Sequence, residues 1–345
     1  MRIRGVTGEC EIILGGKLGD VSEHCCSDRV VVVTDPTVRR LHGAGFPSAP
    51  VVEIGEGEES KTLETVSRIY ERFLELELDR TSFVLGIGGG VVCDVTGFAA
   101  STFCRGLPFG FVPTTMLAQV DASLGGKNGV NLRAYKNLVG TIRQPRFCLL
   151  DYDLLRTLPT RAVRCGIAEI VKSAAVGDEE LFGMLEVDPD ALLALERGAV
   201  HTAVSRSVAV KAAVVEEDES DQAARMKLNF GHTLGHSIEK AVGLPHGEAV
   251  SVGMVAAARV SVGRGRLPDS AAKRLATLLT RFGLPTRIEW DEVPIIDAIG
   301  KDKKRAGGRL RMTLLDRIGH AVVEEVTVEE LMDAAAVTPQ RSPGR

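Results

Sequence analysis

The chain has 345 residues, enough for two domains of ordinary size that each bury a core. Its hydrophobic content of 44% excludes a disordered protein, and its formal net charge of -4 gives no reason to expect nucleic acid or an anionic membrane as a partner. The N-terminal residues lack the apolar core of a signal peptide, and no run of about 18 apolar residues occurs. Seven cysteines without CxxC spacing favour a reducing cytoplasm.

Residues 29–151 alternate short apolar runs with helical patterns. The alternation predicts a mostly parallel α/β sheet, and we expect this α/β domain to occupy residues 1–160. The expected strands are RVVVVTD (29–35), VVEIG (51–55), SFVLGIGGG (82–90), FGFVP (109–113) and FCLLD (147–151), and the expected helices span 63–78 and 91–103.

Beyond residue 160 the strand signal nearly disappears. Helical periodicity runs from residue 162 to about 304, and RLRMTLLDRIGHAVVEEV (309–326) is a hairpin candidate. The last nine residues, 337–345, are polar and predict a frayed tail. We therefore expect a helical second domain over residues 161–345, with one small late hairpin.

Three consecutive glycines, Gly88–Gly90, lie between an expected buried strand and an expected helix. Glycine lets backbone N–H groups approach a diphosphate, and the following helix N-terminus favours negative charge. A tight structural turn is the alternative, because the spacing is not GxGxxG. Asp35 follows the first strand and could reach a ribose hydroxyl.

Residues 111–140 form the longest polar run in an otherwise apolar region. Loops of this kind at strand ends hold substrates in α/β proteins, and a merely solvated loop is the alternative. The run carries Asp121, Lys127, Asn131, Lys136 and Asn137 among glycines.

Three of the seven histidines lie in the segment 225–246. On one continuous helix, Arg225, Asn229, His232 and His236 would share a face at i, i+4, i+7 and i+11, with His246 after the turn at Gly243 and Pro245. Neutral imidazole is a good zinc ligand, and a catalytic zinc takes three protein groups.

A carboxylate from elsewhere would complete this metal site. Glu169 and Lys172 share a face of an apolar helix at i, i+3, so Glu169 is either this third ligand or half of an ordinary ion pair. Lys211 occupies a position among apolar residues of an expected helix. The cations Lys301, Lys303, Lys304 and Arg305 either complement a helix dipole or form an anion site.

In this order, GGGVVCDVTGFAASTFCRG, PTTMLAQVDASLGGKNGVN, YKNLVG, AEIVK, LNFGHTLGH and LPHGEAV resemble the 3-dehydroquinate synthase family, over about residues 30–325. The resemblance implies a Rossmann-like NAD-binding domain, a helical domain that binds metal and substrate, Zn²⁺ or Co²⁺ as the metal, and a homodimer.

The resemblance also implies roles for individual residues. The metal ligands would be Glu169, His232 and His246. Residues around the substrate would be Asp121, Lys127, Asn137, Lys172, Lys211, Arg225, Asn229, His236 and Lys303, with Arg105 reaching the neighbouring subunit's site. Cofactor-binding positions would be Asp35, Glu58, Lys61, Gly89, Gly90, Val91, Asp94, Thr114, Thr115, Asp121, Lys127, Lys136 and Thr157.

The family reaction converts 3-deoxy-D-arabino-heptulosonate 7-phosphate into 3-dehydroquinate and phosphate. It proceeds by transient oxidation with NAD, phosphate elimination, re-reduction and an intramolecular aldol closure. At least five cations and a metal suit such an anionic substrate.

The chain departs from the family pattern at Asp221 and Ala162, where glutamate is common, and at Asn128, where threonine is common. Sister sugar-phosphate cyclases, amino-dehydroquinate synthase above all, remain an alternative. A metal-dependent NAD alcohol dehydrogenase of the glycerol dehydrogenase type is a second alternative, and a non-catalytic phosphate- or NAD-binding module is a third.

Overall fold

The computed structural model describes residues 1–133, 135–221, 224–288 and 309–335. The chain forms two compact units: unit 1 comprises Met1–Val163 and Arg197–Ser220, and unit 2 comprises Arg164–Glu196 and Asp221–Arg345. The chain therefore passes between the units three times, whereas the sequence suggests one boundary near residue 160. Within the described ranges, no helix is long and apolar enough to cross a membrane.

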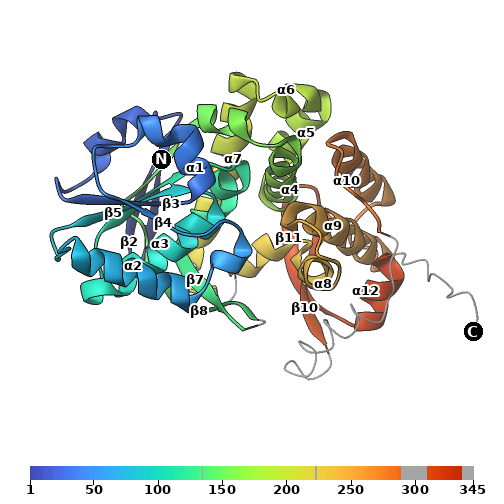
Figure 1. The fold of residues 1–345 in the computed structure, drawn as a ribbon. Helices are drawn as coiled ribbons and strands as arrows, with labels where there is room; N and C mark the ends of the chain where they lie inside the picture. Colours follow the sequence, from blue (N-terminus) through green and yellow to red (C-terminus); the bar gives the residue numbers. More distant parts are fainter. Residues whose placement is uncertain (134, 222–223, 289–308, 336–345) are drawn as a thin grey trace, which may run out of the picture. The chain divides into compact units, whose positions relative to one another are not determined.

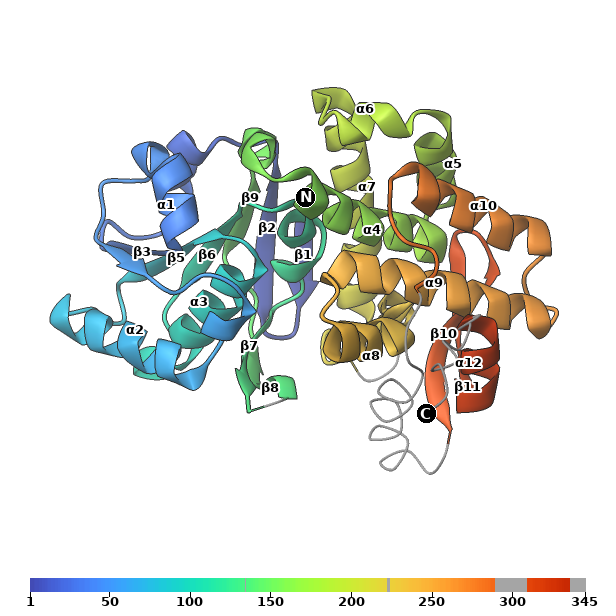
Figure 2. The same cartoon turned by 45° about the vertical axis from the view of Figure 1, so that its right-hand side comes forward.

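Unit 1 contains a seven-stranded sheet in the order β1-β2-β9-β6-β5-β3-β4, in which β1 and β2 are antiparallel and the other neighbours parallel. The helix α1 lies on one side of this sheet and α2 and α3 lie on the other (Figures 1 and 2). The α/β prediction is thus confirmed. The strands are β1 (Arg2–Gly5), β2 (Gly8–Leu14), β3 (Val30–Thr34), β4 (Val51–Glu53), β5 (Phe83–Gly88), β6 (Phe109–Pro113) and β9 (Phe147–Leu150), and the helices are α1 (Pro36–His42), α2 (Leu63–Glu75), α3 (Gly90–Thr102) and α7 (Arg197–Glu217).

Strand β5 illustrates why this sequence forms a buried parallel strand. Phe83, Leu85 and Ile87 alternate along it and join the core cluster that includes Val38 of α1. The opposite face carries glycines, because α3 packs directly against it. A Cβ on Gly88 would lie 2.5 Å from Val92 Cβ. The glycines of this motif therefore bring the helix N-terminus onto the strand end.

Residues 111–140 do not form a single loop, so the prediction of a loop here was wrong. Its second half forms an antiparallel hairpin of β7 (Lys127–Leu132) and β8 (Tyr135–Ile142). Gly129 and Gly140 face each other across this hairpin, and a Cβ on Gly140 would lie 2.4 Å from Asn128 O. The glycines thus permit close strand pairing that a polarity pattern does not reveal.

Unit 2 is helical with one late hairpin, as predicted. Its elements are most of α4 (Thr160–Gly177), α5 (Glu179–Val187), α6 (Pro189–Leu193), α8 (His232–Val242), α9 (His246–Gly263), α10 (Asp269–Arg281), β10 (Leu310–Arg317), β11 (His320–Val326) and α12 (Val328–Ala335). The cations 301–305 and the tail 337–345 lie outside the described residues.

Candidate functional site

The histidine segment is not the single helix that its spacing suggests. Arg225 and Asn229 lie on a short 3-10 turn, Ala224–Asn229, and α8 begins only at His232. The break falls at Gly231, whose φ of 83° is left-handed. Arg225 is buried, whereas Asn229 and His236 are exposed. Of the four residues expected to share one helical face, only His232 and His236 do so, one turn apart on α8.

Close packing of α8 on α9 explains the glycines of this segment. A Cβ on Gly235 would lie 3.1 Å from Val250 Cα, and one on Gly253 would lie 1.9 Å from Gly231 O. Gly243, with φ of 72°, ends α8, and Pro245 precedes His246 at the start of α9. His246 thereby returns to the face of α8 that carries His232, and their ring centroids lie 5.3 Å apart.

Helix α4 supplies the carboxylate that meets these two rings. Glu169 is fully buried, and its Oε1 lies 3.7 Å from His232 Nε2 and 3.4 Å from His246 Nε2. Lys172 Nζ lies 2.6 Å from the other oxygen, Oε2. Metal–ligand bonds of 2.0–2.2 Å at a tetrahedral angle separate two donor atoms by about 3.4 Å. Glu169, His232 and His246 could therefore hold one zinc or cobalt ion, while Lys172 engages the other carboxylate oxygen.

The charges in this cluster are strongly coupled. Burial raises the pKa of Glu169, but Lys172, His232 and His246 together hold it well below its usual value. Burial lowers the pKa of His232 to about 3, so its imidazole is neutral, as metal binding requires. Burial also disfavours the charged form of His246, but hydrogen bonds with Glu169 and Glu239 raise its pKa to about 10. A cation between the donors would replace that proton.

Glu239 is a member of this cluster that the sequence analysis missed. Its Oε2 lies 3.3 Å from His246 Nδ1. The signal was present, since Glu239 stands seven residues after His232 and so shares its helical face.

A second cluster lies in unit 1 around Asp121. This residue occupies a π-helical turn, Ala118–Ala122. Lys211 of α7 reaches it, with Nζ 2.5 Å from Asp121 Oδ1 and 2.6 Å from the Asp121 carbonyl oxygen. Only 8% of the Lys211 side chain is exposed. The structure thus brings together two of the predicted substrate residues that lie 90 positions apart in the sequence.

The expected dinucleotide loop lies where the strand order reverses. Strand β4 lies on one side of β3 and β5 on the other, so the carboxyl ends of β3 and β5 flank the crevice that holds nucleotides in such sheets. Gly89 precedes the first turn of α3, which holds Gly90 and Val91, and Thr114 donates its N–H to Gly88 O at 2.9 Å. A Cβ on Gly89 would lie 3.2 Å from Thr115 Cγ2, so a larger residue here would have to displace the Thr115 side chain slightly.

Asp35 follows β3 and caps α1, accepting a hydrogen bond from Val38 N at 2.8 Å. This capping bond engages Oδ1. Burial raises the pKa of Asp35.

Several predicted cofactor residues form one polar group in unit 1. Lys61 is 4% exposed and pairs with Asp94, and it also donates to Asn137 Oδ1 at 2.5 Å. Burial raises the pKa of Asp94 to about 6, although Lys61 opposes the shift. Asn131 links the group to Glu58 through a 2.8 Å hydrogen bond.

The remaining predicted residues of unit 1 are exposed: Arg105, Lys127, Lys136 and Thr157. Thr157 Oγ1 lies 3.0 Å from His42 Nε2. Lys303 falls outside the described residues.

The structure accounts for one of the three departures from the family pattern. Asn128 is buried and donates to Gly126 O at 2.8 Å and Arg143 O at 3.0 Å, against Gly97 of α3. It therefore serves the hairpin's packing. Nothing in the structure explains Asp221 or Ala162.

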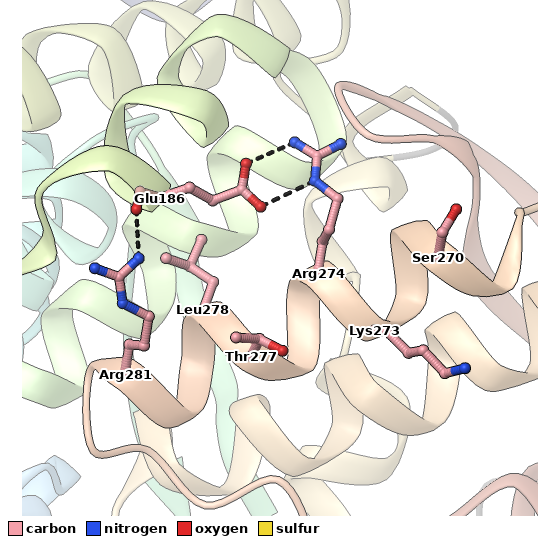
Figure 3. A pocket seen from close by; sticks show the side chains of 7 residues that line it. All are labelled: Glu186, Ser270, Lys273, Arg274, Thr277, Leu278 and Arg281. Atoms are coloured by element: carbon pink, nitrogen blue, oxygen red, sulfur yellow. Dashed lines mark hydrogen bonds and ion pairs between the residues drawn. The ribbon is translucent and has the colours of Figure 1, made fainter.

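A cavity of about 340 Å³ lies elsewhere in unit 2, between α5 and α10 (Figure 3). Its charged side chains are largely paired: Arg274 makes two bonds to Glu186, at 2.6 and 2.9 Å, and Lys273 lies 2.6 Å from Asp269. We assign these ion pairs a structural role and the cavity no part in catalysis. Its lining is Glu186, Ser270, Lys273, Arg274, Thr277, Leu278 and Arg281.

Together, the doubly wound sheet of unit 1 and the carboxylate–histidine cluster of unit 2 define the class of two-unit proteins with the sugar-phosphate cyclase fold. A 2-deoxy-scyllo-inosose synthase, solved with carbaglucose-6-phosphate, NAD⁺ and Co²⁺, has a TM-score of 0.87 at 27% identity and matches 97% of this chain and 98% of its own. A 2-epi-5-epi-valiolone synthase from Streptomyces hygroscopicus subsp. jinggangensis 5008, solved with NAD⁺ and Zn²⁺, has a TM-score of 0.86 at 29% identity over 96% of both chains.

Sequence comparison defines the family more closely. Family models for the 3-dehydroquinate synthase N-terminal and C-terminal regions match residues 51–165 and 166–305. The 3-dehydroquinate synthase of Pelotomaculum thermopropionicum is 44% identical over 310 residues, which are 86% of this chain and 83% of that protein. The chain belongs to the 3-dehydroquinate synthase family.

Proposed function

We propose that this chain is an enzyme that converts 3-deoxy-D-arabino-heptulosonate 7-phosphate into 3-dehydroquinate and inorganic phosphate, a carbon–oxygen lyase reaction of the shikimate pathway. The observation that carries the proposal is the convergence of Glu169, His232 and His246, with Lys172 on the same carboxylate, in a member of this family.

Residues 1–160 would bind NAD, and Glu169, His232 and His246 of unit 2 would bind the metal. The Gly88–Gly90 turn would receive the cofactor's diphosphate, because helix N-termini bind anions. Bound NAD would supply a hydride acceptor that is restored before product leaves, and the zinc or cobalt ion would supply Lewis acidity toward a substrate hydroxyl.

Charged side chains would hold the substrate's carboxylate and phosphate in one pose. Charge-assisted hydrogen bonds contribute roughly 1.5–3 kcal/mol each, so a few of them suffice to orient a small anion. Lys172 and Arg225 are both buried, which strengthens their attraction for an anion relative to a surface cation. We assign substrate contacts to Lys172, Lys211, Arg225, Asn229, His236, Asp121, Lys127, Asn137 and Lys303.

His236 would act next to the leaving phosphate. It is exposed on α8, one turn from His232, with its ring centroid 5.1 Å from that of His232. A neutral imidazole at this position can accept a proton from a donor beside the substrate. The side-chain amide of Asn229 can donate a hydrogen bond to the phosphate oxygens.

A homodimer is proposed from the family resemblance, in which Arg105, an exposed residue of this chain, would reach the neighbouring subunit's site. A reducing cytoplasm is proposed because all seven cysteines carry free thiols.

Substrate preference tests the proposal against the sister cyclases. The zinc-loaded protein with NAD is offered the heptulosonate 7-phosphate, its amino analogue, and the sugar phosphates of inosose and valiolone cyclases, and released phosphate is measured. We expect the heptulosonate to be preferred at least a hundredfold in kcat/KM. Preference for another substrate would assign the chain to a sister activity.

A further inference from the structure

Both imidazoles of the metal cluster are oriented in the same way. Each presents Nε2 to Glu169 Oε1 and Nδ1 to an oxygen acceptor. For His232 the acceptor is the Phe230 carbonyl oxygen at 3.3 Å, and for His246 it is Glu239 Oε2 at 3.3 Å. Ligand histidines commonly donate their outer N–H to such an oxygen, which fixes the tautomer and the ring plane.

The two acceptors differ in how they are held. Phe230 precedes His232 by two residues and is fully buried, so its carbonyl is part of the turn that starts α8. His246 follows the α8–α9 turn, and 27% of its side chain is exposed. The backbone before His246 contains Pro245, and the described acceptor for this ring is the Glu239 side chain, reached across the turn.

We propose that Glu239 is a positioning residue for the metal site: its carboxylate accepts the Nδ1 hydrogen of His246 and holds Nε2 toward the ion. This inference rests on the proposed assignment of Glu169, His232 and His246 as ligands. A carboxylate acceptor makes a stronger, charge-assisted bond than a carbonyl, which suits the more exposed of the two rings.

A competing arrangement uses the same residues differently. Donor atoms of His236, Glu239 and His246 also lie within 4.8 Å of one another, so Glu239 could bind an ion directly. In that case His246 would present Nδ1 to the metal, and Glu169 would take no part.

Zinc affinity separates these arrangements without relying on activity. Zinc binding by the full-length protein is measured by competition with a chromophoric chelator for the wild type and four variants: Glu239→Ala, Glu239→Gln, Glu169→Gln and Lys240→Ala. Loss of an outer carboxylate typically weakens metal binding 10–100-fold. We expect that loss for Glu239→Ala, and a loss within about threefold for Glu239→Gln, because the amide oxygen accepts the same hydrogen bond.

Lys240→Ala, an exposed change on the same helix, controls for helix damage and should bind zinc as the wild type does. Wild-type affinity in Glu239→Ala, or equal losses in Glu239→Ala and Glu239→Gln, would overturn the positioning role. Retained affinity in Glu169→Gln would overturn the ligand assignment itself, which distinguishes failure of the metal site from failure of this inference.

Discussion

Lys211 donates hydrogen bonds to both the carboxylate and the backbone carbonyl of Asp121, although the two residues stand 90 positions apart. The pair ties α7 to the π-helical turn that follows β6. A π-helical turn is uncommon and is often associated with function, so this contact fixes a site element as well as a fold element.

Lys211→Met should lower both stability and activity. The change leaves the Asp121 carboxylate without its buried ammonium partner, and we expect the free energy of unfolding in urea to fall by about 1–3 kcal/mol. We expect kcat/KM to fall at least about tenfold. Lys273→Met is the matched control, because Lys273 forms an exposed pair with Asp269, and exposed pairs contribute about 0–1 kcal/mol. Equal effects of the two changes would count against a special role for Lys211.

His246→Ala should lose bound metal and activity while unit 1 stays folded, because the ligand is removed from a three-donor site. Metal content is measured by elemental analysis after dialysis, and folding by circular dichroism. Full zinc occupancy in the variant would show that His246 is not a ligand.

Lys172→Ala and Arg225→Ala should each cost at least about 2 kcal/mol in kcat/KM, through lost contacts with the substrate's anionic groups. Steady-state kinetics are compared at equal zinc content, since Lys172 also contacts Glu169. Lys240→Ala is the control. Near-normal kinetics in both variants would move the substrate site elsewhere.

Stability should depend on pH through Asp94, whose pKa burial raises to about 6 against 3.8 for the usual group. A carboxyl with a raised folded-state pKa stabilises the fold below the usual pKa, and this contribution is lost as pH rises through about 6. The free energy of unfolding of the wild type minus that of Asp94→Asn should therefore decrease by on the order of 3 kcal/mol between pH 4 and pH 7. A difference that is flat or rises over this range would contradict the buried, protonatable Asp94.

Local patterns were sufficient to predict most of the sheet and the metal candidates. Alternation of apolar runs predicted the strands of residues 29–151, and the i, i+3 spacing placed Glu169 with Lys172 on one helix face. His232 was singled out by its helical spacing from Arg225, Asn229 and His236, and His246 by its place after the glycine and proline that end the helix.

What the sequence did not reveal depends on tertiary contacts. The helix break at Gly231 follows from the approach of α9, which leaves no room for a Cβ there. The β7–β8 hairpin was hidden because lysines, asparagines and glycines interrupt the hydrophobic alternation along both strands. The Lys211–Asp121 pair spans 90 residues and has no local spacing to detect. Glu239 was overlooked although its spacing from His232 was visible.

The stoichiometry of one reaction mixture decides whether this chain catalyses the proposed reaction. The zinc-loaded protein is incubated with catalytic NAD and 3-deoxy-D-arabino-heptulosonate 7-phosphate. We measure three quantities together: inorganic phosphate, 3-dehydroquinate by coupling to a dehydroquinase, and NADH by its absorbance at about 340 nm. We expect equal amounts of phosphate and 3-dehydroquinate and no accumulating NADH. NADH that accumulates with turnover, without phosphate release, would contradict it and indicate an alcohol dehydrogenase.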